Sequence, residues 1–151
     1  GLSKEEFLNK LRKNFKIEEL FVAEKPSETH QITMCIEGDW YRLTCAPEII
    51  NESHPVECLD AEILTNFVLK PLLGINDLKT DTNIDFISGK RDLESIQRKI
   101  GMGKFKIGFF LYPVDISVIK RVADHNMTMP PKSTWVEPKL RSGLTIYNIN
   151  E

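Results

Sequence analysis

The residues best suited to chemistry lie near the end of the chain, in MTMPPKSTWVEPKLRSGLTIY (residues 127–147). Three cations stand here against one carboxylate, Glu137, which leaves a local charge of +2. Cations and hydroxyl groups at close spacing suit a phosphate or carboxylate ligand. The groups concerned are Lys132, Ser133, Thr134, Lys139 and Arg141.

Three prolines stiffen this stretch, namely Pro130, Pro131 and Pro138. Each proline fixes φ, so the loop loses little entropy on ordering and would present its side chains rigidly. Trp135 would then either stack on a base or fill part of the core. Two interpretations follow. The stretch is a ligand-facing loop with candidate binding residues Lys132, Ser133, Thr134, Trp135, Lys139 and Arg141, or it is a rigid structural connector.

A second glycine-containing segment, GMGKFKIG (residues 101–108), invites comparison with phosphate-binding loops. Such a loop requires a strand, then glycines, then a helix, so that amides at the helix N-terminus face the phosphates. Here the expected order is helix, glycines, strand. We therefore expect a helix stop followed by a turn.

The segment HPVECLD (residues 54–60) brings four ligand-type side chains together in sequence. A zinc site needs three or four converging groups, and the chain has no second Cys/His pair to complete one. We expect surface-loop and cap residues here and no metal site. No nucleophile elbow of the G-x-S-x-G type is present either. The sequence therefore predicts no catalytic residues and no cofactor, with a nucleotide left open as a ligand.

Composition indicates an ordinary globular domain. Of 151 residues, 41% are hydrophobic and 28% are charged, and the formal net charge is −2. This charge argues against nucleic acid as a partner for the domain alone. No stretch approaches the roughly 18 apolar residues of a membrane span, so we expect a cytoplasmic protein. We expect one domain over residues 2–151, with Gly1 a tag scar on a piece excised from a longer protein.

Apolar periodicity and capping residues predict four helices. The first, near residues 4–14, begins with a capping box between Ser3 and Glu6. The second starts at Asp60 as its N-cap, is ended or kinked by Pro71 and stops at Gly74. The remaining two are capped by Asp92 and Asp115. The last should turn Val118, Ile119, Val122 and Ala123 inward, and His125 should lie at its C-terminus.

The clearest strand signal is HQITMCIEGDWYRLTC (residues 30–45). A two-residue turn at Gly38 and Asp39 would place six apolar side chains on one face of a hairpin. The predicted pairs are Ile36 with Tyr41, Met34 with Leu43 and Ile32 with Cys45. This register also places Cys35 and Cys45 on opposite faces. All three cysteines should therefore be reduced and buried.

Further strands are expected at residues 17–21, 84–87, 104–112 and 144–149. The strand at 104–112 is apolar on both faces, which favours a central position in the sheet. The chain therefore predicts an α+β (mixed α/β) fold. One mostly antiparallel or mixed sheet of about five to six strands would be covered by four helices.

Three segments carry a resemblance to a known family. MPPKSTWVEPKLRSGLTIY (residues 129–147), LDAEILTNFVLKPLLGI (residues 59–75) and GDWYRLT (residues 38–44) resemble elements of domain-of-unknown-function family 1015. The matches to the terminal element are Met129, Pro130, Pro131, Lys132, Ser133, Thr134, Trp135, Pro138, Lys139, Gly143 and Leu144. The resemblance assigns no catalytic role to any of them.

Members of this family are longer than this chain, and their N-terminal part is often described as similar to the ParB/Spo0J nuclease-like fold. That part carries an Asp-Gly-His-His-Arg-like motif, which this sequence lacks. The resemblance therefore implies a C-terminal portion whose partner is the missing N-terminal domain. Its expected function is to bind a phosphate-bearing ligand or nucleotide through residues 129–141 at an inter-domain cleft. The alternative is a non-catalytic interaction or homodimerisation module with a structural proline-rich loop.

Overall fold

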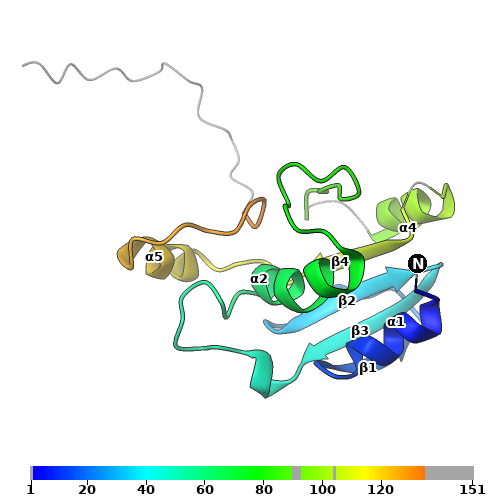
Figure 1. The fold of residues 1–151 in the computed structure, drawn as a ribbon, viewed down its shortest axis with the longest axis horizontal. Coiled ribbons are helices and arrows are strands. Elements are labelled where there is room, and N and C mark those ends of the chain that lie inside the picture. Colours follow the sequence, from blue (N-terminus) through cyan, green and yellow to red (C-terminus); the bar gives the residue numbers. More distant parts are fainter. Residues whose placement is uncertain (1, 90–92, 104, 135–151) are drawn as a thin grey trace, which may run out of the picture.

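The computed structural model describes residues 2–89, 93–103 and 105–134 (Figure 1). Within these residues it shows an α+β fold with a single antiparallel sheet, which confirms the predicted class. None of the helices in the described ranges is both long and apolar enough to cross a membrane. The elements in chain order are α1 (Lys4–Leu11), β1 (Phe15–Leu20), β2 (Gln31–Ile36), β3 (Asp39–Cys45), η1 (Pro47–Ile49), α2 (Asp60–Leu64), η2 (Thr65–Leu69), α3 (Lys70–Leu73), α4 (Leu93–Gly101), β4 (Ile107–Leu111) and α5 (Ile116–Asp124).

The sheet has the strand order β1-β3-β2-β4, and every neighbouring pair is antiparallel. The hairpin between β2 and β3 exists as expected, but its predicted register is wrong. Its turn residues are Glu37 and Gly38, both with positive φ (53° and 95°), so Met34 pairs with Tyr41 and Ile32 pairs with Leu43. Positive φ at both turn residues matches the right-handed twist of the flanking strands.

The predicted faces of the hairpin are nevertheless confirmed. Each partner is displaced by two residues from the predicted one, and a shift of two preserves the alternation of side chains between faces. Ile32, Met34, Ile36, Tyr41, Leu43 and Cys45 all belong to one buried cluster. Cys35 lies in the cluster on the other face, and Cys35, Cys45 and Cys58 are all free and buried.

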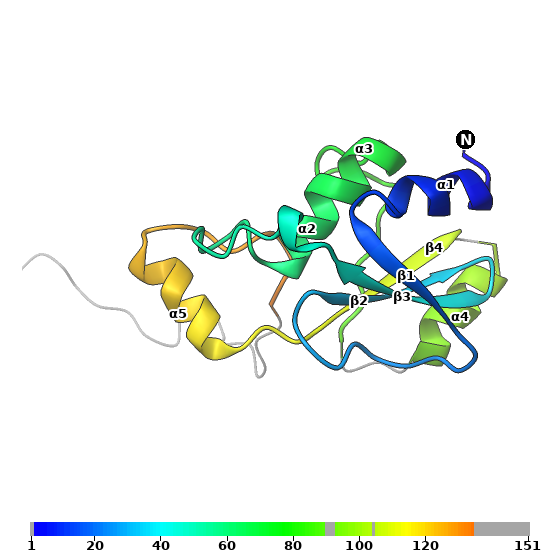
Figure 2. The ribbon, with the colours of Figure 1, turned by 90° about the horizontal axis from the view of Figure 1, so that it is seen from below.

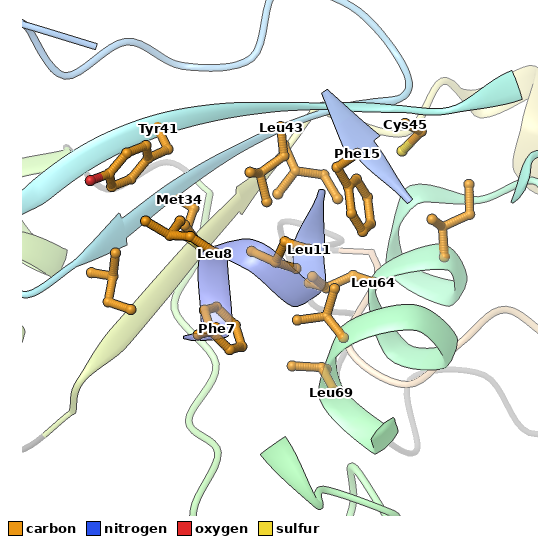
Figure 3. Close-up of a cluster of buried hydrophobic side chains, with 14 of the residues drawn as sticks. Phe7, Leu8, Leu11, Phe15, Met34, Tyr41, Leu43, Cys45, Leu64 and Leu69 are labelled. Atoms are coloured by element: carbon orange, nitrogen blue, oxygen red, sulfur yellow. The ribbon is translucent and has the colours of Figure 1, made fainter. Parts of the chain in front are cut away.

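The main core lies between this face of the sheet and the helices α1 and α2–η2–α3 (Figures 2 and 3). The capping box of α1 is confirmed, because Ser3 Oγ accepts from the Glu6 amide and Glu6 accepts from the Ser3 amide. The helix buries Phe7, Leu8 and Leu11. It therefore leaves its charged residues facing solvent, as amphipathicity requires.

The second predicted helix is continuous over α2, η2 and α3, but its central segment is π-helical. Between α2 and α3 the chain adopts a π-helical segment, η2, which ends at Leu69, two residues before Pro71. Pro71 therefore follows a widened turn at the start of α3 and does not end the helix. Gly74 stops the helix with a left-handed φ of 71°, as predicted.

A second cluster occupies the opposite face of the sheet. It contains Cys35, Trp40, Ile96, Ile100 and Phe110, and α4 provides its cover. Trp40 and Phe110 contact each other with ring centroids 6.4 Å apart. Both faces of β4 are therefore packed, as its apolar pattern predicts.

Two strand predictions need correction. β4 is an edge strand of the sheet that the described residues form, because it pairs with β2 alone. Apolar side chains on both faces indicate that both faces of the strand are buried. They do not indicate a central position, because an edge strand is also buried on both faces when a helix packs against it. Residues 84–87 form no strand; Ile84 packs on the main core and Ile87 packs on the second cluster. The expected strand at 144–149 and the cap residue Asp92 lie outside the described residues.

Candidate functional site

The described part of the candidate loop follows α5, whose N-terminus is capped as predicted. Asp115 Oδ1 accepts from the Ser117 amide at 2.8 Å. At the other end Asn126 has a left-handed φ of 54°, and the Met127 amide donates to the Val122 carbonyl at 3.1 Å. These bonds close a Schellman motif in which Asn126 occupies the usual glycine position. The chain thus leaves the helix in a fixed direction.

Helix α5 is attached to the loop at residues 54–58. Val122 is 1% exposed, and Arg121 Nη2 donates to Cys58 Sγ at 3.1 Å. Val118 and Ile119 are partly buried, but Ala123 is exposed, so its predicted inward position is wrong. The Arg121 contact links α5 to a segment 63 residues earlier in the chain.

The HPVECLD segment is partly core rather than wholly surface. Cys58 is 7% exposed and its Sγ donates to the Pro55 carbonyl at 3.6 Å. His54 Nδ1 accepts from the Glu57 amide at 3.1 Å and so acts as a local cap. Across the described ranges, no three His, Cys, Asp or Glu side chains are grouped closely enough to hold a metal ion.

The loop itself turns tightly at its first prolines. Pro130 is buried, and its carbonyl accepts from both the Ser133 amide (3.3 Å) and the Ser133 hydroxyl (2.7 Å). Lys132 lies inside this turn with a left-handed φ of 61°, and its side chain is exposed. Thr134 is also exposed. The other candidate residues, Trp135, Lys139 and Arg141, lie outside the described residues.

This geometry distinguishes the described candidate residues by role. The hydroxyl hydrogen of Ser133 is already donated to Pro130, so Ser133 stabilises the turn and has only lone pairs to offer a ligand. Among the described residues, no carboxylate lies within ion-pair distance of the Lys132 ammonium. Within this part of the chain, Lys132 therefore presents an unpaired cation from a backbone that is fixed on both sides.

The sequence did not predict a contact between Asp60 and His30. Asp60 Oδ1 accepts from the backbone amide of His30 at 2.9 Å and lies 3.1 Å from His30 Nδ1. The predicted cap is therefore wrong. The N-cap of α2 is Leu59, which makes no side-chain hydrogen bond to the helix, and Asp60 is the first residue of α2. His30 itself has a φ of 66°, so the carboxylate secures a strained residue at the start of β2.

The electrostatics of this cluster argue against nucleophilic chemistry. Burial raises the pKa of Asp60, against the lowering effect of its bonds to His30. Burial, reinforced by the charge of Asp60, raises the pKa of Cys45 to about 12. A thiol of that pKa is protonated at neutral pH and is not a nucleophile. Asp60 and His30 therefore form a structural clasp.

Replacing Asp60 by asparagine tests this clasp through its pH dependence. Because the folded-state pKa of Asp60 is raised above its ordinary 3.8, its contribution to stability is greatest below that value and falls as pH rises through the raised pKa. An asparagine side chain at this position would keep the oxygen that accepts from His30 without ionising. Urea unfolding should show Asp60→Asn gaining stability relative to wild type as pH rises above the ordinary pKa of 3.8.

Asp115→Asn is the matched control with the opposite sign. The pKa of Asp115 is lowered by its bonds to the Ser117 hydroxyl and amide, so its stabilising effect is present at neutral pH and lost as pH falls. This variant should lose stability relative to wild type as pH rises. An Asp60→Asn variant that followed the same trend would contradict a raised pKa for Asp60.

Comparison with known proteins gives one family match. Residues 1–62 match the model of the family described as Protein of unknown function (DUF1015). This stretch includes GDWYRLT and the start of LDAEILTNFVLKPLLGI, whereas the terminal MPPKSTWVEPK lies beyond it. No curated protein and no solved structure matches the chain. Over residues 1–62, from α1 to the first turn of α2, the chain is thus similar to DUF1015, a family whose description states no function.

Proposed function

We propose that residues 129–141 bind a phosphate-bearing ligand and that this chain is a non-catalytic, C-terminal portion of a ParB-like protein. The ligand would lie in a cleft shared with an N-terminal domain, and a nucleotide is one form that it could take. Lys132, Lys139 and Arg141 would neutralise its charge. Thr134 would donate a hydrogen bond, and Trp135 would stack on any base.

The observation that carries this proposal is the conformation of Lys132. A left-handed backbone at a residue other than Gly or Asn costs on the order of 1 kcal/mol, and such strain is concentrated at functional sites. Here the strain is maintained by the buried Pro130 and by two bonds from Ser133 to its carbonyl. An exposed ammonium fixed in this way loses less entropy when a ligand binds.

Removing the loop's lysines should weaken binding. We expect full-length protein carrying Lys132→Gln and Lys139→Gln to bind ATP and tripolyphosphate at least about tenfold less tightly, because each charge-assisted bond to phosphate contributes about 1.5–3 kcal/mol. Titration calorimetry measures the change. Lys16→Gln is the control, since it removes one exposed lysine, paired with Glu18, from β1. Equal affinities of the double variant and wild type would contradict the proposal.

One observation favours the alternative of an interaction module. Immediately after β1, Phe21 is 101% and Val22 is 70% exposed, and both border a surface hollow of about 490 Å³. Exposed apolar side chains beside a hollow are typical of protein contacts. In this alternative the proline-rich loop is structural and its lysines are dispensable for phosphate binding. Sedimentation that found only monomer would remove its homodimer form.

A further inference from the structure

A polar groove lies between the C-terminal end of α1 and the helical segment η2–α3. Its volume is about 400 Å³. The side formed by the end of α1 carries Lys10, Lys13 and Asn14, and the side formed by η2 and α3 carries Asn66 together with the apolar Phe67 and Pro71. The residues that matter here are Lys10, Lys13, Asn14, Asn66, Phe67 and Pro71.

The α1 side is fixed by the way α1 ends. Because α1 turns Phe7, Leu8 and Leu11 into the core, Lys10 and Lys13 remain exposed beside the groove. The backbone of Asn14 is held on both sides, since its amide donates to Leu11 (3.0 Å) and its carbonyl accepts from Ala46 of the segment after β3 (2.9 Å).

The opposite side comes from the π-helical segment. Asn66 and Phe67 both belong to η2, and π-helical turns occur frequently at functional sites. The side chain of Asn66 is held in place, because its Nδ2 donates to Glu62 at 3.0 Å and its Oδ1 accepts from Lys70 at 2.9 Å. A third ammonium group, that of Lys70, therefore lies next to the groove.

Charge at the groove favours an anion. Lys10, Lys13 and Lys70 place three ammonium groups at or beside the groove, against the one carboxylate of Glu62 that bonds to Asn66. Among the described residues, neither Lys10 nor Lys13 has a carboxylate within ion-pair distance. The negative end of the α1 dipole accounts for a lysine in its last turn, but not for Asn66, Phe67 and Pro71 on the opposite side.

We propose that this groove binds a small molecule that joins a phosphate group to a flat apolar group. Lys10 and Lys13 would contact the phosphate, Asn14 and Asn66 would supply amide hydrogen bonds, and Phe67 with Pro71 would pack against the flat group. Phosphate bound by mobile exposed lysines alone is weak, so Phe67 and Pro71 should supply part of the affinity. None of the described loop residues 129–134 lines this groove.

Phenyl phosphate is a probe with both features. Titrated into the ¹⁵N-labelled chain, it should shift the amide resonances of Lys13, Asn14, Asn66 and Phe67 together, with dissociation in the millimolar range or tighter, about 1 mM. Lys10→Gln/Lys13→Gln should weaken this binding at least about tenfold. Phe67→Ala should weaken phenyl phosphate while leaving the response to inorganic phosphate unchanged.

The controls separate this groove from the loop. Lys106→Gln removes an exposed lysine outside the groove, and Lys132→Gln removes the cation proposed for the loop. Both variants should show the wild-type phenyl phosphate shifts at the groove amides of Lys13, Asn14, Asn66 and Phe67, and any change caused by Lys132→Gln should be confined to the amides of the loop. The proposal would be overturned if up to about 10 mM phenyl phosphate left the groove amides unshifted, or if phenol alone bound equally well. Inorganic phosphate binding as tightly as phenyl phosphate would overturn the role of Phe67 and Pro71.

Discussion

Leu11→Ala should lower the free energy of unfolding by about 3 kcal/mol, within the range of about 2–5 kcal/mol for buried leucines. Leu11 is 0% exposed and lies in the main cluster between α1 and the sheet (Figure 3). The substitution removes apolar contact and leaves a cavity that a helix anchored at both ends cannot fully close. Urea unfolding monitored by circular dichroism measures the loss.

Leu2→Ala is the matched control for this prediction. Leu2 precedes the capping residue of α1 and is 39% exposed, so the same chemical change should alter stability by no more than about 0.5 kcal/mol. Comparable losses for the two variants would mean that α1 does not pack on the sheet as the structure describes.

Gly108→Ala should destabilise the protein by about 1–3 kcal/mol, the usual cost of overpacking. A Cβ atom at Gly108 would lie 2.4 Å from Ile96 Cγ2 and 3.4 Å from Ile100 Cδ1. The isoleucine methyl group is attached to a branched carbon in α4, so it cannot rotate away freely. Gly108 is therefore the residue that lets α4 approach β4 closely.

Ile96→Ala should rescue Gly108→Ala in part. In the double variant the clash is absent, so the combined loss of stability should be smaller than the sum of the single losses by about 1 kcal/mol. Gly101→Ala is the control, because no atom lies within 4 Å of its added Cβ and alanine is the better helix former. Strictly additive losses at positions 96 and 108 would show that α4 does not contact Gly108.

The parts of the fold that the sequence predicts are those set by short-range rules. The Ser3–Glu6 box, the Asp115 cap and the glycine stop at Gly74 each depend on residues within one helical turn. The hairpin faces were predictable because alternation survives a shift of two residues. The turn was misplaced because Glu37 adopts a left-handed φ that is uncommon for glutamate.

Contacts between distant segments were not predictable. Asp60 leaves its expected cap position for His30, 30 residues away, and only the folded sheet brings the two together. Segment 84–87 has a strand-like composition but pairs with no strand in the described part of the chain. Ile84 packs against the main core and Ile87 packs against the second cluster. No local sequence pattern distinguishes a loop that contacts both clusters from a strand.

The candidate loop was predictable from its residue types, but its geometry was not. Prolines and lysines mark the stretch in the sequence, whereas the burial of Pro130, the internal bond of Ser133 and the left-handed Lys132 depend on tertiary structure. The groove between α1 and η2 could not be predicted from the sequence. Its lysines look like an ordinary solvated helix face until Asn66 and Phe67 of a distant segment are placed opposite.

If the turn at Pro130–Thr134 presents a cation to phosphate, an amide-resolved titration with tripolyphosphate should detect the binding. It should be performed on the Lys10→Gln/Lys13→Gln chain, so that the groove does not compete. We expect saturable shifts at Lys132, Ser133 and Thr134 that are lost when Lys132→Gln is added. Unshifted amides at these three residues in a folded protein at about 10 mM ligand would contradict it.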